Sequence, residues 1–383
     1  MRAYLDHAST SPLRPVARAA MEPWWSASDP GRVHTEGRMA RSALEDARAA
    51  VAALFGTRPR QVIFTSGATE AVNAATFGAL RAAGPAAAVM LAEVEHSSVR
   101  EATALWASST IPVPVDGAGR ISVADVQAVL SERSDVGLVH CQLANHEVGT
   151  RQPVAEVAAR CRAAGVLLHV DAAAGAGHVA IDFDALGADL MSVSAHKMGG
   201  PQGVGVLLVR RGLRVPPLIV GGAQERARRG GMEPVAAAVG FGAVAEWLAG
   251  SPEAPGGRLA AEAARATALT DRLRAEIGRV DGVVAYGPVE PGDRLPHLLC
   301  IGVEGVEAEP VLIGLDRAGV AAHSGSSCSS EALEPSPVLE AMGVDGERSL
   351  RLSVGWSTTD QEVTAAVEAF PRVVADLRRL RRA

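Results

Sequence analysis

The chain has 383 residues, of which 48% are hydrophobic and 21% charged, and its formal net charge is −6 with an isoelectric point near 6.0. This composition is typical of a globular protein, and the length exceeds what one hydrophobic core usually serves, so we expect two domains. The negative charge balance provides no basic surface, so we expect no direct binding of nucleic acid.

The N-terminal segment, residues 1–7, has no apolar h-region, and no apolar run has transmembrane length. We therefore expect no signal peptide and no membrane contact. The four cysteines show no paired spacing typical of a zinc site or a disulfide framework: they are Cys141, Cys161, Cys300 and Cys328. A cytoplasmic protein with reduced thiols is the consistent interpretation.

Short apolar runs alternate with helix-length segments through the first two thirds of the chain. Seven runs have the character of buried strands: 62–65, 87–91, 111–115, 136–141, 166–170, 190–193 and 204–209. This alternation predicts an α/β fold whose large domain contains a mainly parallel, seven-stranded sheet. Ligands bind such sheets beyond the carboxyl ends of the strands. Each candidate motif described below falls at the end of a predicted strand.

A break rich in glycine and proline, residues 250–257, separates this region from the rest of the chain. Beyond it the apolar spacing predicts two amphipathic helices and three strands. The helices fall around residues 269–280 and 360–377, and the strands at 283–286, 298–303 and 350–354. We predict a large domain over residues 12–250 and a small α+β domain formed by residues 1–11 together with 251–383.

Lys197 ends the segment Ser194-Ala195-His196-Lys197, which follows a predicted buried strand and precedes a Gly-Gly-Pro turn. A partly desolvated amine at such a junction loses its proton more easily and becomes a nucleophile toward carbonyl groups, as a Schiff base requires. A solvated turn lysine is the simpler structural alternative.

The segment Thr65–Glu70 follows a predicted strand and opens a helix. Its small residues let backbone N–H groups approach an anion, and a helix N-terminus favours negative charge. The segment therefore suits a phosphate. The segment is neither a Walker loop nor a dinucleotide fingerprint, and the same residues would also serve simply to turn the chain into a helix.

Two titratable residues follow other predicted strands. His96 could stack on an aromatic ring or move protons, although a hydrogen-bonded loop histidine explains it equally simply. Asp171 ends an apolar run, where a carboxylate needs a partner that offsets its desolvation, such as a protonated ring nitrogen. An ordinary N-cap aspartate is the alternative.

Cys328 lies in the Gly/Ser-rich segment 323–330, where nothing in the sequence buries it. An exposed thiol on a mobile loop favours a nucleophilic or sulfur-carrying role, whereas the other three cysteines lie in contexts typical of a core. Arg351 interrupts an apolar strand. It could be a surface arginine on an edge strand, or it could bind a substrate carboxylate through a bidentate fork.

In their order and spacing these motifs resemble the cysteine desulfurases of the NifS/IscS type, within the class V aminotransferase-like pyridoxal phosphate enzymes of fold type I. The resemblance runs nearly from end to end. It is carried by Tyr4-Leu5-Asp6, Phe64–Glu70, Glu95-His96, Glu147-Val148-Gly149, His169-Val170-Asp171, Ser194–Lys197, Gly221–Arg226, Ser324–Ser330, Glu334-Pro335-Ser336 and Arg351-Leu352-Ser353.

The resemblance implies that the cofactor is pyridoxal 5′-phosphate, attached to Lys197 through a Schiff base. Asp171 would keep the pyridine nitrogen protonated, so that the cofactor acts as an electron sink, and His96 would stack on the ring and shuttle protons. The cofactor's phosphate would be bound by Thr69, Ser194 and His196, at the helix start that includes Ala68.

The resemblance further implies that Arg351 fixes the carboxylate of L-cysteine and that Cys328 attacks the substrate sulfur. The products would be L-alanine and a persulfide on Cys328. The long Gly/Ser loop resembles the subgroup that hands its persulfide to a sulfur-acceptor protein. Members of the family are homodimers with active sites near the interface, so we expect the same here.

Three positions depart from the family pattern. His146 stands where an asparagine lies near the phenolic oxygen of the cofactor, and Ala174 stands where a glutamine donates to that oxygen. Met232 replaces a threonine that reaches the phosphate bound by the partner subunit. Losing a charge-assisted donor costs about 1.5–3 kcal/mol. We therefore expect looser binding or altered electronics of the cofactor unless His146 supplies the missing donors.

Two other functions remain open. One is a different pyridoxal phosphate activity on the same scaffold, such as a C–S lyase, a selenocysteine lyase or an epimerase, none of which needs the thiol of Cys328. The other is a non-catalytic, partner-binding protein, in which Lys197, Asp171 and Cys328 would have no reason to occur together.

Overall fold

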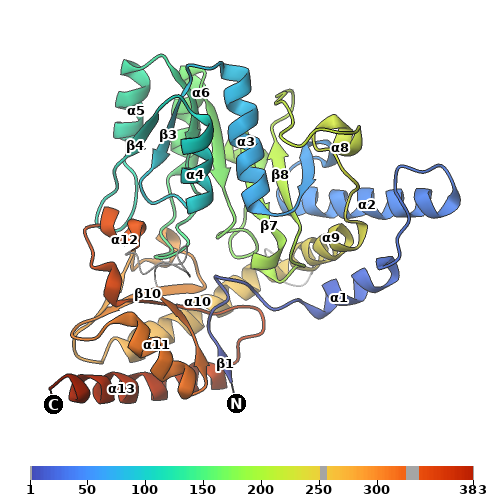
Figure 1. Ribbon diagram of the computed structural model, residues 1–383. Coiled ribbons are helices and arrows are strands. Elements are labelled where there is room, and N and C mark those ends of the chain that lie inside the picture. The colour runs from blue at the N-terminus through green and yellow to red at the C-terminus, as the bar shows by residue number, and fades with distance from the viewer. Residues whose placement is uncertain (1, 251–256, 325–335, 383) are drawn as a thin grey trace.

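The computed structural model describes residues 2–250, 257–324 and 336–382. Its larger part contains a seven-stranded sheet between helices, and its smaller part contains a four-stranded sheet packed against helices (Figure 1). The large sheet consists of β2 (Val62–Thr65), β3 (Ala88–Ala92), β4 (Thr110–Val113), β5 (Val136–His140), β6 (Leu167–Asp171), β7 (Leu190–Ser194) and β8 (Gly205–Val209).

The helices of the larger part begin and end within one or two residues of turn or capping signals in the sequence. They are α1 (Pro15–Met21), α2 (Thr35–Leu54), α3 (Ala68–Ala83), α4 (Ser97–Trp106), α5 (Val123–Glu132), α6 (Val154–Ala164), α7 (Phe183–Leu186), α8 (Gln224–Ala227) and α9 (Val235–Ala249). For example, the side chain of Ser122 caps α5 by accepting a hydrogen bond from the N–H group of Asp125.

The strand order of the large sheet is β2-β8-β7-β6-β5-β3-β4. Strand β8 is antiparallel to both of its neighbours, and all other pairs between β7 and β4 are parallel. Six strands therefore point in the same direction. The prediction of a mainly parallel, seven-stranded sheet is confirmed, and the carboxyl ends of those six strands meet at one edge.

Apart from the partly exposed edge strand β4, the strands of this sheet are buried on both faces, which explains why they are continuous apolar runs. In β8, Val206 and Leu208 belong to the core shared with α2 and α9, whereas Leu207 and Val209 belong to the core under α3. Successive side chains of a strand point to opposite faces. Helices on both sides thus hold the sheet rigidly and fix the loops at its edge.

The smaller part contains β9 (Val283–Tyr286), β10 (Leu298–Val303), β12 (His323–Ser324) and β13 (Ser349–Ser353), in the order β12-β13-β10-β9. Its helices are α10 (Gly257–Ile277), α11 (Ala308–Arg317), α12 (Pro337–Ala341) and α13 (Asp360–Arg382). Ile301, Leu350 and Phe370 belong to a hydrophobic core separate from that of the large sheet.

The first residues of the chain join this C-terminal part. Strand β1 (Ala3–Tyr4) pairs in parallel with β11 (Val320–Ala321), and Asp6 forms a bridge with Ser353. In Figure 1 the N-terminus accordingly lies beside α13. This pairing agrees with the expected grouping of residues 1–11 with 251–383, although the domain boundaries themselves stay a prediction.

A buried ion pair fixes a strained turn between β8 and α9. Glu225, Arg226 and Ala227 have φ angles of 48°, 59° and 60°, in the left-handed region that is unfavourable for residues other than glycine. The carboxylate of Glu225 accepts hydrogen bonds from both terminal nitrogens of Arg48, at 2.5 and 2.7 Å, and from the N–H group of Phe64 at 2.9 Å. These contacts hold the turn against α2 and β2.

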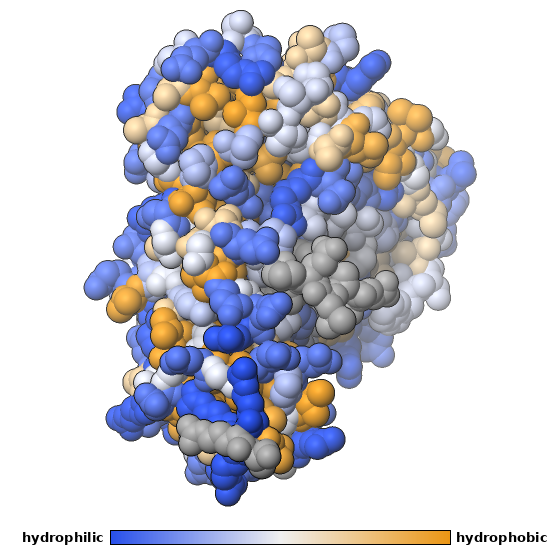
Figure 2. All heavy atoms as spheres, turned by 60° about the vertical axis from the view of Figure 1, so that its left-hand side comes forward, coloured by the Kyte–Doolittle hydropathy of each residue, from blue (hydrophilic) through white to orange (hydrophobic). Residues whose placement is uncertain are grey.

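No helix in the described part of the chain is long and apolar enough to cross a membrane. On the face shown in Figure 2, hydrophobic residues form separate patches between hydrophilic ones.

Candidate active site

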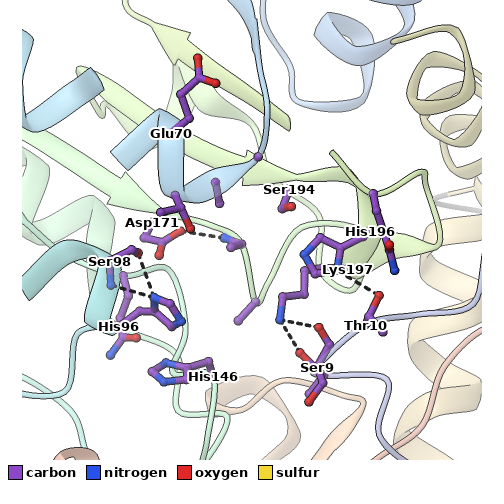
Figure 3. Close-up of a pocket in the computed structure, with 18 of the residues that line it drawn as sticks. Ser9, Thr10, Glu70, His96, Ser98, His146, Asp171, Ser194, His196 and Lys197 are labelled. Atoms are coloured by element: carbon purple, nitrogen blue, oxygen red, sulfur yellow. Dashed lines mark hydrogen bonds between the residues drawn. The ribbon is translucent and has the colours of Figure 1, made fainter. Parts of the chain in front are cut away.

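A pocket of about 530 Å³ opens where the parallel strands end (Figure 3). Its walls come from the β2–α3 turn, the ends of β6 and β7, the loop after β5, the N-terminal residues 8–10, and Arg351 of β13. Except for Cys328, every residue predicted to belong to the site lines it: Ala68, Thr69, His96, His146, Asp171, Ser194, His196, Lys197 and Arg351.

The N-terminus of α3 forms one wall of the pocket. The first N–H groups of a helix have no intrahelical partner, and those of Ala68 and Thr69 lie in this first turn. The carboxylate of Glu70 accepts a hydrogen bond from the N–H group of Ser66 at 2.8 Å and pairs with Arg229 at 2.9 and 3.1 Å. Glu70 also lines the pocket, but its carboxylate is directed away from Lys197 (Figure 3), and Arg229 offsets its negative charge near the helix start.

Asp171 is the last residue of β6 and is buried. Its Oδ1 accepts hydrogen bonds from the hydroxyl group of Ser192 at 2.9 Å and from the N–H group of Ala173 at 3.1 Å. No helix of the described chain begins at Asp171, so the N-cap alternative is wrong. The carboxylate lines the pocket, where it can accept a further hydrogen bond from a protonated ring nitrogen.

A second buried carboxyl group lies close enough to Asp171 for their charges to interact. The Oε1 atom of Glu95 accepts a hydrogen bond from the N–H group of Gln142 at 2.7 Å. Burial, followed by the negative charge of Asp171, raises the pKa of Glu95 to about 8. Glu95 is therefore protonated at neutral pH, and the two carboxyl groups do not place two negative charges in one buried region.

Lys197 lies on the short 3-10 helix η3 (Ala195–Met198), directly after β7. Its side-chain nitrogen donates hydrogen bonds to the backbone oxygens of Ala8 at 2.6 Å and Ser9 at 3.0 Å (Figure 3). The amine therefore lies within the pocket rather than in bulk water, so the solvated-turn alternative is wrong. The neighbouring His196 has its Nδ1 atom 3.1 Å from the hydroxyl group of Thr10.

His96 and His146 form an edge-to-face pair at the opposite wall, with ring centroids 5.0 Å apart and ring planes at 72°. The Nδ1 atom of His96 accepts a hydrogen bond from the N–H group of Ser98 at 3.1 Å and caps α4. His146 has its Nε2 atom 3.5 Å from a carboxylate oxygen of Glu147. His96 is thus both a hydrogen-bonded capping residue and a ring on the pocket wall.

Arg351 reaches the pocket from the smaller part of the molecule. Its strand β13 lies between β12 and β10, so the edge-strand alternative is wrong. The guanidinium is buried and donates to the backbone oxygen of His146 at 3.0 Å, the hydroxyl group of Ser9 at 2.7 Å and the carboxylate of Asp6 at 3.3 Å. Its Nε atom has no partner in the described part of the chain. A cation is thereby held at the rim of the pocket.

The three cysteines within the described residues are buried, as the sequence predicts. Cys141, Cys161 and Cys300 are free and buried. Burial raises the pKa of all three thiols, to about 12 for Cys161, which makes them poor nucleophiles. Cys328 lies outside the described residues. Its role therefore stays a prediction from the sequence.

Several lining residues were not predicted, including Ser9, Thr10, Gln142 and Gln202. Ser9 and Thr10 follow the Tyr-Leu-Asp opening, which was the available signal for them. No sequence signal indicated Gln142, because its place at the pocket depends on the path of the loop after β5. No group of three or more residues able to hold a metal ion occurs among the residues that the structure describes.

This set of groups fits pyridoxal 5′-phosphate. An amine suited to bind an aldehyde, a carboxylate suited to a protonated pyridine nitrogen, and a helix N-terminus suited to a phosphate surround one pocket. With the mainly parallel sheet below it, this arrangement is typical of α/β enzymes of the pyridoxal phosphate-dependent class. The aminotransferase class-V family model matches residues 3–366. The chain belongs to this family, whose enzymes use pyridoxal 5′-phosphate.

Individual relatives point to sulfur chemistry. The chain is 38% identical to an IscS-like cysteine desulfurase of Mycobacterium tuberculosis, over 98% of this chain and 97% of the relative. Among solved structures, a NifS-like protein superimposes with a TM-score of 0.87 at 26% identity, covering 98% of this chain and all of the other. SspA in complex with cysteine superimposes with a TM-score of 0.77 at 26% identity, covering 93% and 100%.

Proposed function

We propose that the protein is a pyridoxal phosphate-dependent cysteine desulfurase. It converts L-cysteine to L-alanine and holds the sulfur as a persulfide on Cys328 until an acceptor protein takes it. The observation that carries this proposal is the convergence of Lys197, Asp171 and Arg351 on one pocket. The cysteine desulfurase relative and the similarity to a protein that binds cysteine support the choice of substrate.

In this proposal Lys197 would hold the cofactor covalently and Asp171 would bind its ring nitrogen. His96 would stack on the ring, and His146 would serve its phenolic oxygen. The phosphate would be bound by the start of α3, the end of β7 and the short helix η3, through Ala68, Thr69, Ser194 and His196. When bound, pyridoxal 5′-phosphate supplies an electron sink for charge that develops at the α-carbon of the substrate.

The remaining chemistry belongs to the chain itself. The guanidinium of Arg351 orients the carboxylate of L-cysteine, and the amine of Lys197 and the imidazole of His96 hold and move protons at the pocket. The thiol of Cys328 accepts the sulfur. In balance, L-cysteine and the Cys328 thiol give L-alanine and the Cys328 persulfide, so no external oxidant or reductant is needed for this half of the reaction.

We further propose that two copies assemble into a homodimer in the cytoplasm, with each copy divided into domains 12–250 and 1–11 with 251–383. Trp25 and Met232 are each 67% exposed and line a second hollow of about 590 Å³. Gln202 lines both this hollow and the main pocket, so the hollow adjoins the site. Exposed apolar surface of this kind is typical of subunit contacts.

A different pyridoxal phosphate activity, such as a C–S lyase, a selenocysteine lyase or an epimerase, is the second candidate. It is favoured by Ala174 and His146, since the methyl group of Ala174 offers no hydrogen bond at the pocket wall. A non-catalytic, partner-binding role is the third. The three candidates differ in whether the activity needs Lys197 and Cys328.

One set of measurements separates them. The purified protein is examined for the visible absorbance of bound pyridoxal 5′-phosphate, and alanine and sulfide are measured with L-cysteine and a reductant. We expect Lys197→Ala to lose the absorbance of the covalently bound cofactor, and Cys328→Ser to keep it but form no persulfide. Cys161→Ser, at a buried thiol, is the matched control and should stay active. Continued turnover in Cys328→Ser would favour a lyase, and a colourless, inactive protein would favour the partner-binding role.

A further inference from the structure

Behind Lys197 lies a second, smaller compartment, which we call the back compartment. Four residues form the wall that it shares with the main pocket, because they line both: Ala8, His146, Ala174 and Lys197. Its other lining residues are His7, His178, His297 and Leu298. Histidine side chains therefore dominate a space directly adjacent to the proposed cofactor site.

Two of these imidazoles are stacked on one another. The rings of His178 and His297 have centroids 3.5 Å apart and planes at 12°. The Nε2 atom of His178 lies 3.3 Å from the backbone oxygen of Lys197. Because a carbonyl oxygen only accepts, this nitrogen of His178 carries the hydrogen. His178 thus ties the stacked pair to the backbone of the residue that holds the cofactor.

His297 differs from the other histidines of the back compartment in its hydrogen bonding. His7 has both ring nitrogens within hydrogen-bond distance of hydroxyl groups, at 2.9 and 3.2 Å. The Nδ1 atom of His297 is buried and has no partner in the described part of the chain. Burial lowers the pKa of His297 well below its ordinary value, so the ring is neutral. A buried polar nitrogen without a partner is costly, and proteins usually pair such atoms with a protein group or an ordered water.

We propose that the back compartment binds one water molecule, which hydrogen-bonds to Nδ1 of His297 and donates a hydrogen bond past Ala174 to the ligand in the main pocket. The compartment has a volume of about 10 Å³, the smallest that holds one water, and four histidines and a lysine are among its lining residues. Ala174 matters because it lines both the back compartment and the main pocket with only a methyl group, whereas a longer side chain would separate the water from the ligand.

A high-resolution crystal structure of the purified protein tests the water site without reference to catalysis. We expect density for a water within hydrogen-bond distance of Nδ1 of His297. The density should be lost in His297→Phe, which keeps an aromatic ring for the stack on His178 but removes both nitrogens. His297→Phe should also unfold at a lower urea concentration. No density in the wild type, or a higher urea midpoint in the variant, would overturn the proposal.

The hydrogen bond to the ligand rests on the proposed function, because the ligand is taken to be pyridoxal 5′-phosphate. Ala174→Leu and Ala174→Gln add side chains of similar size, but only glutamine brings an amide donor. A hydrogen-bond donor stabilises the deprotonated, more negative form of the bound cofactor and so lowers its pKa. Loss of the water donor therefore raises the pH midpoint at which the visible absorbance changes. We expect a rise of about one pH unit in Ala174→Leu and little change in Ala174→Gln.

Equal shifts in the two Ala174 variants, or no shift in Ala174→Leu, would show that no water-mediated bond reaches the ligand and would overturn that half of the proposal. A wild-type protein without any absorbance from pyridoxal 5′-phosphate would contradict the proposed function instead. In that case the crystallographic test at His297 still decides whether the water site exists.

Discussion

The guanidinium of Arg351 donates a hydrogen bond of 3.0 Å to the backbone oxygen of His146, a residue 205 positions earlier in the chain. This contact joins the small sheet to the loop that follows β5 of the large sheet. It places the cation proposed to bind the substrate carboxylate and the ring proposed to flank the cofactor at the same pocket. The two parts of the molecule therefore build the site jointly.

Arg351→Gln is expected to weaken the binding of L-cysteine, because glutamine cannot provide a charged, bidentate fork. Hydrogen bonds to charged groups contribute about 1.5–3 kcal/mol, so kcat/KM should fall by a factor of about 10–150, mainly through KM. Steady-state kinetics of alanine formation measure this. Arg348→Gln, at a partly exposed arginine three residues earlier, is the control and should leave KM unchanged. An unchanged KM in Arg351→Gln, with the cofactor still bound, would rule out the proposed role.

Glu225→Ala is expected to destabilise the fold by about 3–5 kcal/mol, because both terminal nitrogens of the buried Arg48 guanidinium lose their carboxylate partner. Glu45 remains only at Nε, 3.3 Å away. Urea unfolding, followed by circular dichroism, measures the loss. Asp135→Ala is the control. Asp135 pairs with Arg133 at the surface, where water screens both charges, and this substitution should change the unfolding midpoint little. A similar, small effect at both positions would show that the buried pair contributes little.

Ala227→Gly is expected to stabilise the protein by about 1 kcal/mol, because Ala227 is exposed and has a φ angle of 60° that glycine adopts without a steric cost. The same substitution at Ala375, an exposed position inside α13, should instead cost about 1 kcal/mol. Thermal unfolding of the two variants gives the comparison. Destabilisation by both substitutions would mean that the left-handed turn carries no strain.

Glu95→Gln is expected to change how stability depends on pH. The folded pKa of Glu95 is raised from 4.5 to about 8, so between these values the folded protein keeps a proton that the unfolded chain has lost. The stabilising contribution is complete below pH 4.5 and is lost as the pH rises toward 8. Glutamine keeps the oxygen that accepts from Gln142 but does not titrate.

The free energy of unfolding of Glu95→Gln should therefore fall less than that of the wild type between pH 4.5 and pH 8. Urea titrations at several pH values measure both slopes. Glu290→Gln, at an exposed glutamate, should reproduce the wild-type slope. A Glu95→Gln slope equal to that of the wild type would mean that Glu95 ionises normally in the folded state.

Much of the large sheet could be predicted from local sequence. All seven predicted strands exist, within one or two residues of their expected ends. For six of them the reason is that strands buried on both faces are continuous apolar runs, whereas β4 at the edge is partly exposed. The positions of Ala68, Asp171 and Lys197 at strand ends followed from the same pattern. The direction of β8, antiparallel to both neighbours, did not, because strand direction depends on the path of the connecting segments.

The residues that complete the site were harder to predict. Ser9 and Ala8 hold the amine of Lys197 from nearly two hundred positions away, and no local pattern indicates which backbone oxygens will meet it. Arg351 had two possible roles in the sequence. Only the place of β13 between two other strands removed the edge-strand alternative.

By itself the sequence determined which segments form strands and helices and which reactive groups end them, because periodicity and strand-end chemistry are properties of neighbouring residues. Tertiary structure alone decided which of those groups share a pocket and in which protonation state. Glu95 keeps its proton because it is buried near Asp171. His297 lines the back compartment because the smaller part of the chain packs behind Lys197, and its Nδ1 atom has no partner among the described residues. Burial and long-range contacts set those energies, and neither exists until the chain has folded.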